Sequence, residues 1–134
     1  MVRTARPRRR DWQDIASLLG VDPRHSEDRL DPLWRNVLVA YGDEGILGAC
    51  VATGLSDSTT NPICVPTIVT TSDAHRLGIM ESLLLSITDV AGHRPVTVPV
   101  ESGDDIRIIA CLSVGFRPQR QDASASPDIN MLFA

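Results

Sequence analysis

The sequence contains no lysine: all 13 of its strongly basic side chains, among 134 residues, are arginine. This absence excludes a lysine Schiff base and a lysine nucleophile in the chain. Cysteine is scarce as well, since Cys50, Cys64 and Cys111 are the only three and none belongs to a Cys-x-x-Cys pair. An odd number of such cysteines is typical of reduced thiols in a core, and it supports neither a disulfide framework nor a metal site.

Long apolar runs and an excess of positive charge are also missing. No apolar stretch approaches the length of a membrane span, and no signal-peptide core follows the charged N-terminus, so we expect a cytoplasmic protein with no membrane partner. The formal net charge of −4 argues against nucleic acid as a partner. The basic cluster Arg8–Arg10 has no interleaved aromatic residues and no second patch, so a solvated turn is the favoured interpretation.

The length suits one domain over residues 1–134. Apolar alternation and β-branched runs predict strands at Val2–Arg6, Val37–Tyr41, Ile46–Thr53, Ile63–Thr71, Pro95–Val100 and Ile129–Phe133, and a further segment from Phe116. Helical spacing predicts helices from Asp11 to Gly20, from about Gly78 to Gly92 and over Asp104–Val114, with a short one near Asp31–Arg35. The order β-α-(α)-β-β-β-α-β-α-β-β predicts an α/β (α+β) domain with a mixed, mostly antiparallel sheet flanked by helices.

Local signals refine four features of this order. Asp11 is a candidate N-cap for the first helix, and Gly42–Gly45 is rich in turn formers, which predicts a hairpin. Pro66 removes one ladder hydrogen bond from its strand, so an edge, a bulge or a splay is expected near the middle of that strand. In the last helix, Ile106, Ile109 and Ala110, with Ser113 or Val114, are expected to share one buried face.

The segment Ser72–Leu85 is the centre of the sequence. It joins an apolar strand to an amphipathic helix through a short turn that carries His75 and Arg76, with Gly78 near the start of the helix. The first N–H groups of a helix have no partner within it, and the helix dipole is positive at that end. The sequence therefore predicts an anion site at this turn.

The order of elements, this turn and the later run Val114-Gly115-Phe116-Arg117-Pro118 together resemble the GNAT superfamily of acyl-CoA-dependent N-acetyltransferases. The resemblance covers essentially the whole chain, including the opening Arg3–Pro7 and the helix that follows it. It implies a GNAT-like fold with acetyl-CoA as co-substrate. The family's phosphate turn, [Arg/Gln]-x-x-Gly-x-[Gly/Ala], would fall on His75, Arg76, Leu77, Gly78, Ile79 and Met80, where only Gly78 matches strictly.

The resemblance also implies roles for the flanking elements. Backbone groups of Ile68, Val69 and Thr70 would pair with the pantetheine arm, and Pro66 fits the splay that admits it. Asp104 stands where an asparagine commonly opens the following helix. The position of the family's usual tyrosine acid falls on Cys111, for which a buried small residue is the favoured alternative, and the strand Ile63–Thr71 lacks the carboxylate that often serves as base.

Two functions remain open from the sequence. The first is an N-acetyltransferase that transfers the acetyl group of acetyl-CoA to a small-molecule or peptide amine. The second is a catalytically inactive GNAT-like binding or assembly module, suggested by the departures at His75, Met80, Asp104 and Cys111. Glu101, Asp104 and Asp105 would bind a cationic amine in the first case or merely be solvated, and a homodimer through the late strands is possible in either.

Overall fold

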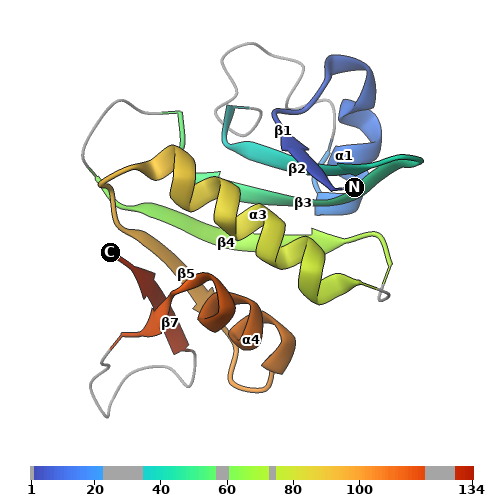
Figure 1. The fold of residues 1–134 in the computed structure, drawn as a ribbon. Helices are drawn as coiled ribbons and strands as arrows, with labels where there is room; N and C mark the ends of the chain where they lie inside the picture. The colour runs from blue at the N-terminus through green and yellow to red at the C-terminus, as the bar shows by residue number, and fades with distance from the viewer. Residues whose placement is uncertain (1, 23–34, 57–60, 73–74, 120–128) are drawn as a thin grey trace.

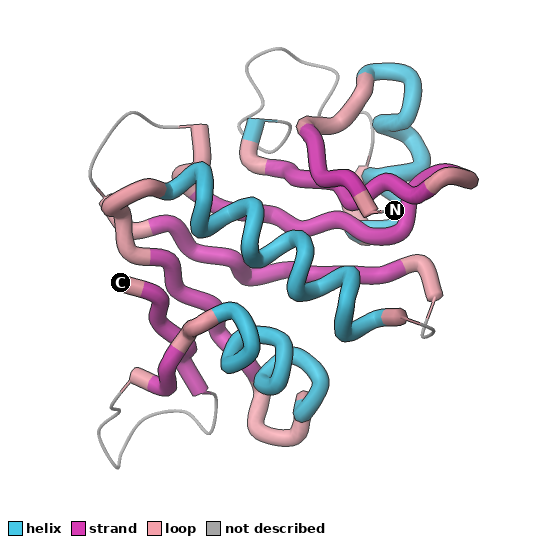
Figure 2. The backbone as a smooth tube through the Cα atoms, in the orientation of Figure 1, coloured by secondary structure: helices cyan, strands magenta, loops and turns pink. Residues whose placement is uncertain are grey.

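The computed structural model describes residues 2–22, 35–56, 61–72, 75–119 and 129–134 (Figures 1 and 2). Seven strands form one sheet in the order β1-β2-β3-β4-β5-β7-β6. Their bounds are β1 Arg3–Ala5, β2 Val37–Gly42, β3 Gly45–Thr53, β4 Ile63–Thr70, β5 Val96–Val100, β6 Arg117–Pro118 and β7 Ile129–Phe133. Only β4 and β5 pair in parallel, so the predicted mixed, mostly antiparallel sheet is confirmed.

Helices cover both faces of this sheet. A 3₁₀ turn, Arg9–Asp11, leads into α1 (Trp12–Leu19), and α3 (Arg76–Ala91) and α4 (Asp105–Val114) follow β4 and β5. Figure 1 shows α3 lying across the strands with α4 beside it. The short helix predicted near 31–35 falls mostly outside the described residues. Within the described part of the chain, no helix is long and apolar enough to cross a membrane.

The alternation of side chains along the strands builds two cores. On one face, Cys50 and Ala52 of β3 join the buried stripe of α3 and the apolar residues of β4 and β5. On the other face, Ala49 joins Trp12 and Ile15 of the α1 side. Because residues of β3 alternate between the two cores, a one-residue shift of this strand would exchange them.

Gly48 sets how closely α3 approaches the sheet. A Cβ atom at this position would lie 2.7 Å from the carbonyl oxygen of Val69 and 2.9 Å from Cγ2 of Ile79. Both distances are shorter than carbon contacts allow, so only glycine fits between β3 and the first turn of α3. The start of α3 is thereby held directly against the end of β4.

The Gly-Phe pair after α4 closes the core at the other end of the sheet. Gly115 has φ +117°, and a Cβ there would lie 3.1 Å from the Phe133 ring. Its N–H bonds back to the carbonyls of Cys111 and Leu112, which ends the helix. The Phe116 ring is fully buried and lies 5.4 Å, centroid to centroid, from that of Phe133.

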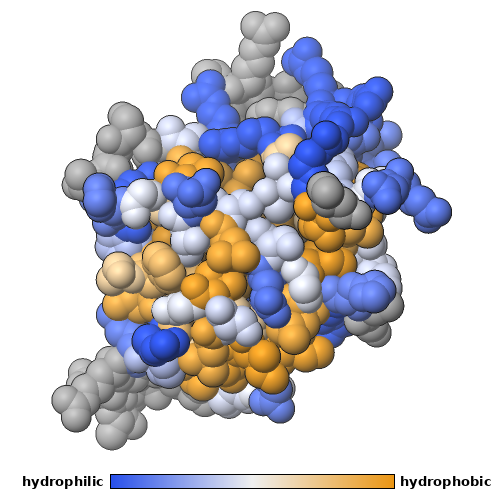
Figure 3. Space-filling model, viewed as in Figure 1, coloured by the Kyte–Doolittle hydropathy of each residue, from blue (hydrophilic) through white to orange (hydrophobic). Residues whose placement is uncertain are grey.

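The predicted face of α4 is wrong in part. Ala110 is buried as expected, but Ile106 and Ile109 are 39% and 48% exposed, and Cys111 is buried instead. The reason is the orientation of α4: it packs on α3 and β5 through Ala110 and Cys111, flanked by the partly buried Ile108 and Val114, which leaves Ile106 and Ile109 outward. Leu85 of α3 and Leu112 of α4 are exposed as well, and Figure 3 shows apolar surface on the face where α3 and α4 lie.

The N-cap predicted at Asp11 is confirmed in position but not in hydrogen bonding. Asp11 occupies the cap position of α1, but its side chain makes no capping hydrogen bond. Its Oδ2 instead accepts a hydrogen bond of 3.2 Å from the nearly buried Tyr41 hydroxyl. The Arg8 guanidinium lies 5.1 Å from the centroid of the same ring, so part of the basic cluster has a structural partner.

Replacing Gly48 tests the close approach of α3. We expect Gly48→Ala to lower the free energy of unfolding by about 1–3 kcal/mol, because the added methyl group must displace backbone or Ile79. Urea denaturation followed by circular dichroism measures this change. Gly78→Ala is the control, since a Cβ there meets no atom within 4 Å. Equal stability of Gly48→Ala and the parent protein would contradict the assigned packing.

Candidate functional site

The strands β4 and β5 separate along their length. They pair only at Ile63–Val96 and Cys64–Thr97, at the beginning of both strands. On its other side, β4 remains paired with β3, with a register irregularity between Val51 and Thr53, opposite Pro66. The bulge and splay expected around Pro66 are therefore both present. Beyond this residue, β4 has an open edge toward β5, meaning that no described strand pairs with it there.

The ladder with β3 fixes which backbone groups face that edge. The Thr71 N–H donates to the Leu47 carbonyl at 2.9 Å, so the pairs that exchange hydrogen bonds alternate from there and include Val69–Ala49. The N–H and C=O groups of Ile68 and Thr70 consequently point toward the splay. Of the three residues that the resemblance assigns to the pantetheine arm, Ile68 and Thr70 have the required direction, and Val69 is engaged with β3.

The turn after β4 leads directly into α3. His75 is exposed and has φ 64° and ψ 15°, the only positive φ of a non-glycine residue in the described ranges, and its side chain does not cap the helix. Residues 73–74 of the turn are outside the described residues. The helix begins at Arg76, two residues before Gly78, so Gly78 lies within the first turn. Because a Cβ at Gly78 would meet nothing within 4 Å, the surface above this turn is open.

The side chains at the last two positions of the motif point into the core. Ile79 and Met80 are 3% and 5% exposed, and both belong to the core beneath α3. The Met80 side chain therefore does not cover the backbone of the turn, although the family pattern has glycine or alanine there. Leu77, at 37% exposure, is the outward residue of this first turn.

The start of α4 faces the same splay. Asp104 caps α4, since its Oδ1 accepts a hydrogen bond of 3.3 Å from the Arg107 N–H. The Arg107 side chain extends to β4, where Nη2 donates to the Ile68 carbonyl at 3.1 Å. Its Nε lies 3.4 Å from Oδ2 of Asp104. Arg107 was not among the site residues predicted from the sequence. The available signal was its position four residues before Cys111, which places a cation on the same side of the helix.

Cys111 lies one turn further along α4 and is fully buried. Burial raises the pKa of its thiol to about 11; the charge of Arg107 opposes this shift and that of Asp104 adds to it. The thiol is thus protonated at neutral pH and enclosed by the core. This is the environment of a small packing residue, the alternative favoured from the sequence.

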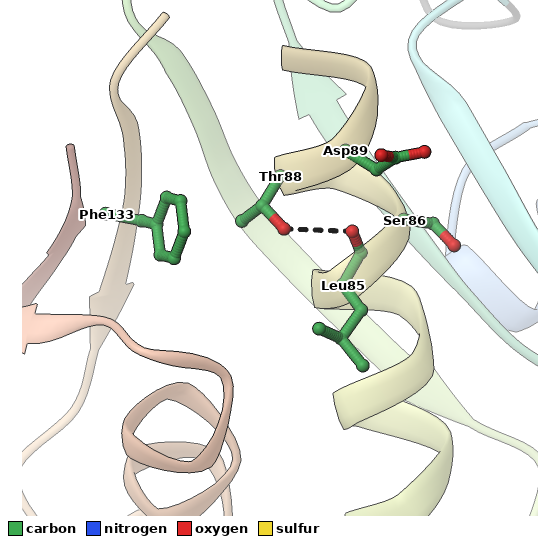
Figure 4. Close-up of a pocket in the computed structure, with 5 residues that line it drawn as sticks. All are labelled: Leu85, Ser86, Thr88, Asp89 and Phe133. Carbon is green, nitrogen blue, oxygen red and sulfur yellow. Dashed lines mark hydrogen bonds between the residues drawn. The ribbon is translucent and has the colours of Figure 1, made fainter. Parts of the chain in front are cut away.

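Tyr41 and a surface depression lie away from the splay and from the turn before α3. Tyr41 belongs to the core on the α1 face, opposite α3. A shallow depression lined by Leu85, Ser86, Thr88, Asp89 and Phe133 runs along the second half of α3, away from the turn at its N-terminus (Figure 4). No group of three or more His, Cys, Asp or Glu side chains in the described part is placed to hold a metal ion.

Comparison with solved structures identifies the fold. A GNAT-family acetyltransferase from Bacillus cereus superposes with a TM-score of 0.73 at 12% identity, over 99% of this chain and 95% of that chain. A Bacillus subtilis acetyltransferase in complex with CoA gives 0.62 at 14% identity, over 98% and 95% of the two chains. The diaminobutyrate acetyltransferase EctA from Paenibacillus lautus, in complex with L-2,4-diaminobutyric acid and coenzyme A, gives 0.66 at 15%, over 98% and 93%.

The chain therefore has the fold of GNAT acetyltransferases, as its sequence suggested. No protein-family model and no curated protein sequence matches it. At 12–15% identity, the likeness concerns the architecture, so activity and ligands are argued below from the chain's own residues.

The three thiols are expected to differ in reactivity. Cys64 is partly exposed, whereas Cys50 and Cys111 are buried and burial raises their pKa values to about 12 and about 11. Because the thiolate is the reactive form, Ellman's reagent should modify Cys64 first and the other two only on unfolding. Mass spectrometry of the labelled peptides identifies the modified residue. Rapid labelling of Cys111 in the native protein would contradict its burial.

Proposed function

We propose that this protein transfers an acyl group from acyl-coenzyme A, with acetyl-CoA as the expected donor, to an amine. One arrangement carries the proposal: the open backbone edge of β4 at Ile68 and Thr70 leads directly to the open first turn of α3 at Gly78. An extended chain with amide groups fits such an edge, and a diphosphate suits a helix N-terminus. Coenzyme A joins these two chemical groups in one molecule.

Each end of this arrangement has a distinct role. The N–H groups in the first turn of α3 would bind the diphosphate, with His75 and Arg76 beside them as cationic or potentially cationic groups. The Ile68 and Thr70 backbone would pair with the pantetheine arm as an additional strand would. Asp104 caps α4, Asp105 lies in its first turn and Glu101 precedes it, and their negative charges would attract a cationic amine.

The second candidate is a GNAT-like module that has no transfer activity. It is favoured by the absence of a carboxylate on β4 and by the burial of Cys111 where a proton donor is usual. If the protein is instead an enzyme, amine deprotonation would have to occur in solution or through water. Binding of coenzyme A is compatible with both candidates, whereas turnover distinguishes them.

Calorimetry with acetyl-CoA tests the proposal at its first step. We expect saturable binding at one site per chain, followed by release of free thiol when amines are added. A panel of diamines, amino acids and peptide N-termini, assayed by a thiol reagent, measures turnover. Binding without turnover on the whole panel would favour the inactive module, and the absence of binding would exclude the enzyme.

Gly78 separates the stability of the fold from the binding of the diphosphate. Gly78→Ala should raise the free energy of unfolding by about 0.5–1 kcal/mol, because alanine favours helix and no atom is near. The same methyl group should weaken coenzyme A binding about tenfold, by about 1.4 kcal/mol, since it stands where the diphosphate approaches. Gly78→Asp adds a negative charge and should abolish binding. Unchanged affinity in both variants would place the diphosphate elsewhere.

Replacing Cys111 tests its role directly. If the thiol were the acid that protonates the leaving thiolate, Cys111→Ala would lower the rate of transfer about a hundredfold. Because the thiol is enclosed and protonated, we expect the rate to persist and only stability to fall. Urea denaturation and single-turnover thiol release, measured on the same preparation, separate the two effects.

A further inference from the structure

Arg107 projects from the first turn of α4 into the splay between β4 and β5. Its side chain is only 19% exposed, yet its one hydrogen bond to a described residue from the guanidinium is to the Ile68 carbonyl. The Nε atom is buried and lies 3.4 Å from the Asp104 carboxylate, without hydrogen-bond geometry. A permanent positive charge is thus held on the open edge of β4, with most of its five donors still available.

The position along β4 indicates which part of a bound molecule this charge would meet. The helix N-terminus that suits the diphosphate follows the end of β4, and Ile68 lies two residues further from it than Thr70, about 7 Å along the strand. An arm that enters from the helix N-terminus passes Thr70 first and reaches Ile68 toward its far end. In an acyl-coenzyme A, that end carries the thioester.

We propose that Arg107 stabilises the coenzyme A thiolate that leaves during acyl transfer. This inference rests on the proposed function and assigns the leaving-group role to a different residue from Cys111. The amine nitrogen attacks the thioester carbonyl carbon, the new C–N bond forms and the C–S bond breaks, and the electron pair stays on sulfur. The guanidinium donates hydrogen bonds to that sulfur and keeps its own protons, and the amine releases its proton to water.

Asp104 positions this charge. Its Oδ1 accepts a hydrogen bond from the Arg107 backbone N–H, and its Oδ2 pairs with Nε of the same residue. The carboxylate therefore holds Arg107 both at its backbone and at Nε. The aspartate thereby helps to hold Nη2 of the guanidinium against the Ile68 carbonyl of β4. The asparagine of the family pattern would bring no negative charge to this position, whereas the aspartate pairs with the guanidinium.

The pH dependence of coenzyme A binding tests the role independently of turnover. Calorimetry would compare coenzyme A with desulfo-coenzyme A, in which hydrogen replaces the thiol, between pH 6 and pH 9.5. A cation beside the sulfur lowers the pKa of the bound thiol by about one unit or more. The affinity for coenzyme A divided by that for desulfo-coenzyme A should therefore rise about tenfold from about pH 6 to about pH 9.5. Arg107→Met should remove the rise while changing the affinity at pH 6 by less than about threefold.

Two further variants complete the test. Arg107→Lys keeps the charge and should retain part of the rise, and it covers the case in which Arg107→Met fails to fold. Arg117→Met is the matched control, because Arg117 is exposed on β6 and, among the described residues, its Nη1 bonds to the neighbouring Phe116 carbonyl. This control should bind both ligands as the parent protein does. Single-turnover transfer by Arg107→Met should be slower by about tenfold to a hundredfold.

The outcomes are distinct. An affinity ratio that rises equally with pH in the parent protein and in Arg107→Met would overturn the inference while leaving the proposed function intact. Tighter coenzyme A binding and faster transfer in Arg107→Met would also overturn it, because the guanidinium would then only obstruct the edge of β4. Failure of the parent protein to bind either ligand would refute the proposed function itself.

Discussion

The parting of β4 from β5 is the constraint on which the candidate site depends. A β-strand inside a sheet normally satisfies its backbone groups on both sides, and an open edge in the middle of a sheet leaves them without a ladder partner. Pro66 lies at the register irregularity where pairing on the β3 side shifts and pairing on the β5 side has ended. The groups of Ile68 and Thr70 that this frees are the ones that a ligand, or the Arg107 side chain, can satisfy.

The other parts of the site are held in place by packing against this strand. Gly48 lets the first turn of α3 lie directly over the end of β4, so the helix N-terminus and the open edge share one surface. Small residues on α4 bring its first turn close enough for Arg107 to span to the Ile68 carbonyl. The core on the α3 face therefore fixes the distance between the candidate anion site and the open edge of β4.

Much of this could be read from local sequence signals. The strand bounds, the hairpin at Gly42–Gly45, the disturbance at Pro66 and the helix start near Gly78 all follow from residues acting on their immediate neighbours. The inward direction of Met80 also follows from its helical spacing with Leu83 and Leu84. Local propensity thus predicted the scaffold of the site.

Contacts between distant elements could not be predicted in the same way. The burial pattern of α4 depends on how closely it approaches α3, which the periodicity of Ile106 and Ile109 does not encode. The hydrogen bond from Arg107 joins residues 39 positions apart, and it depends on both the splay and the orientation of α4. A side chain that acts by bridging two elements leaves no periodic signal on either, so a motif that assigns one role to one position cannot find it.

The replacement of the family's tyrosine acid by a buried Cys111, with Arg107 one turn before it, also changes the expected chemistry of the site. A tyrosine acid would hand a proton to the departing sulfur and would have to recover it in every cycle. Cys111, with its pKa raised to about 11 by burial, and Arg107, which stays charged throughout the accessible range, do neither near neutral pH. If transfer occurs here, the α4 residues would contribute a fixed positive field rather than a proton. The substrate amine would then be the group whose protonation state limits the reaction, and the carboxylate of Asp104 would serve to hold that field in position.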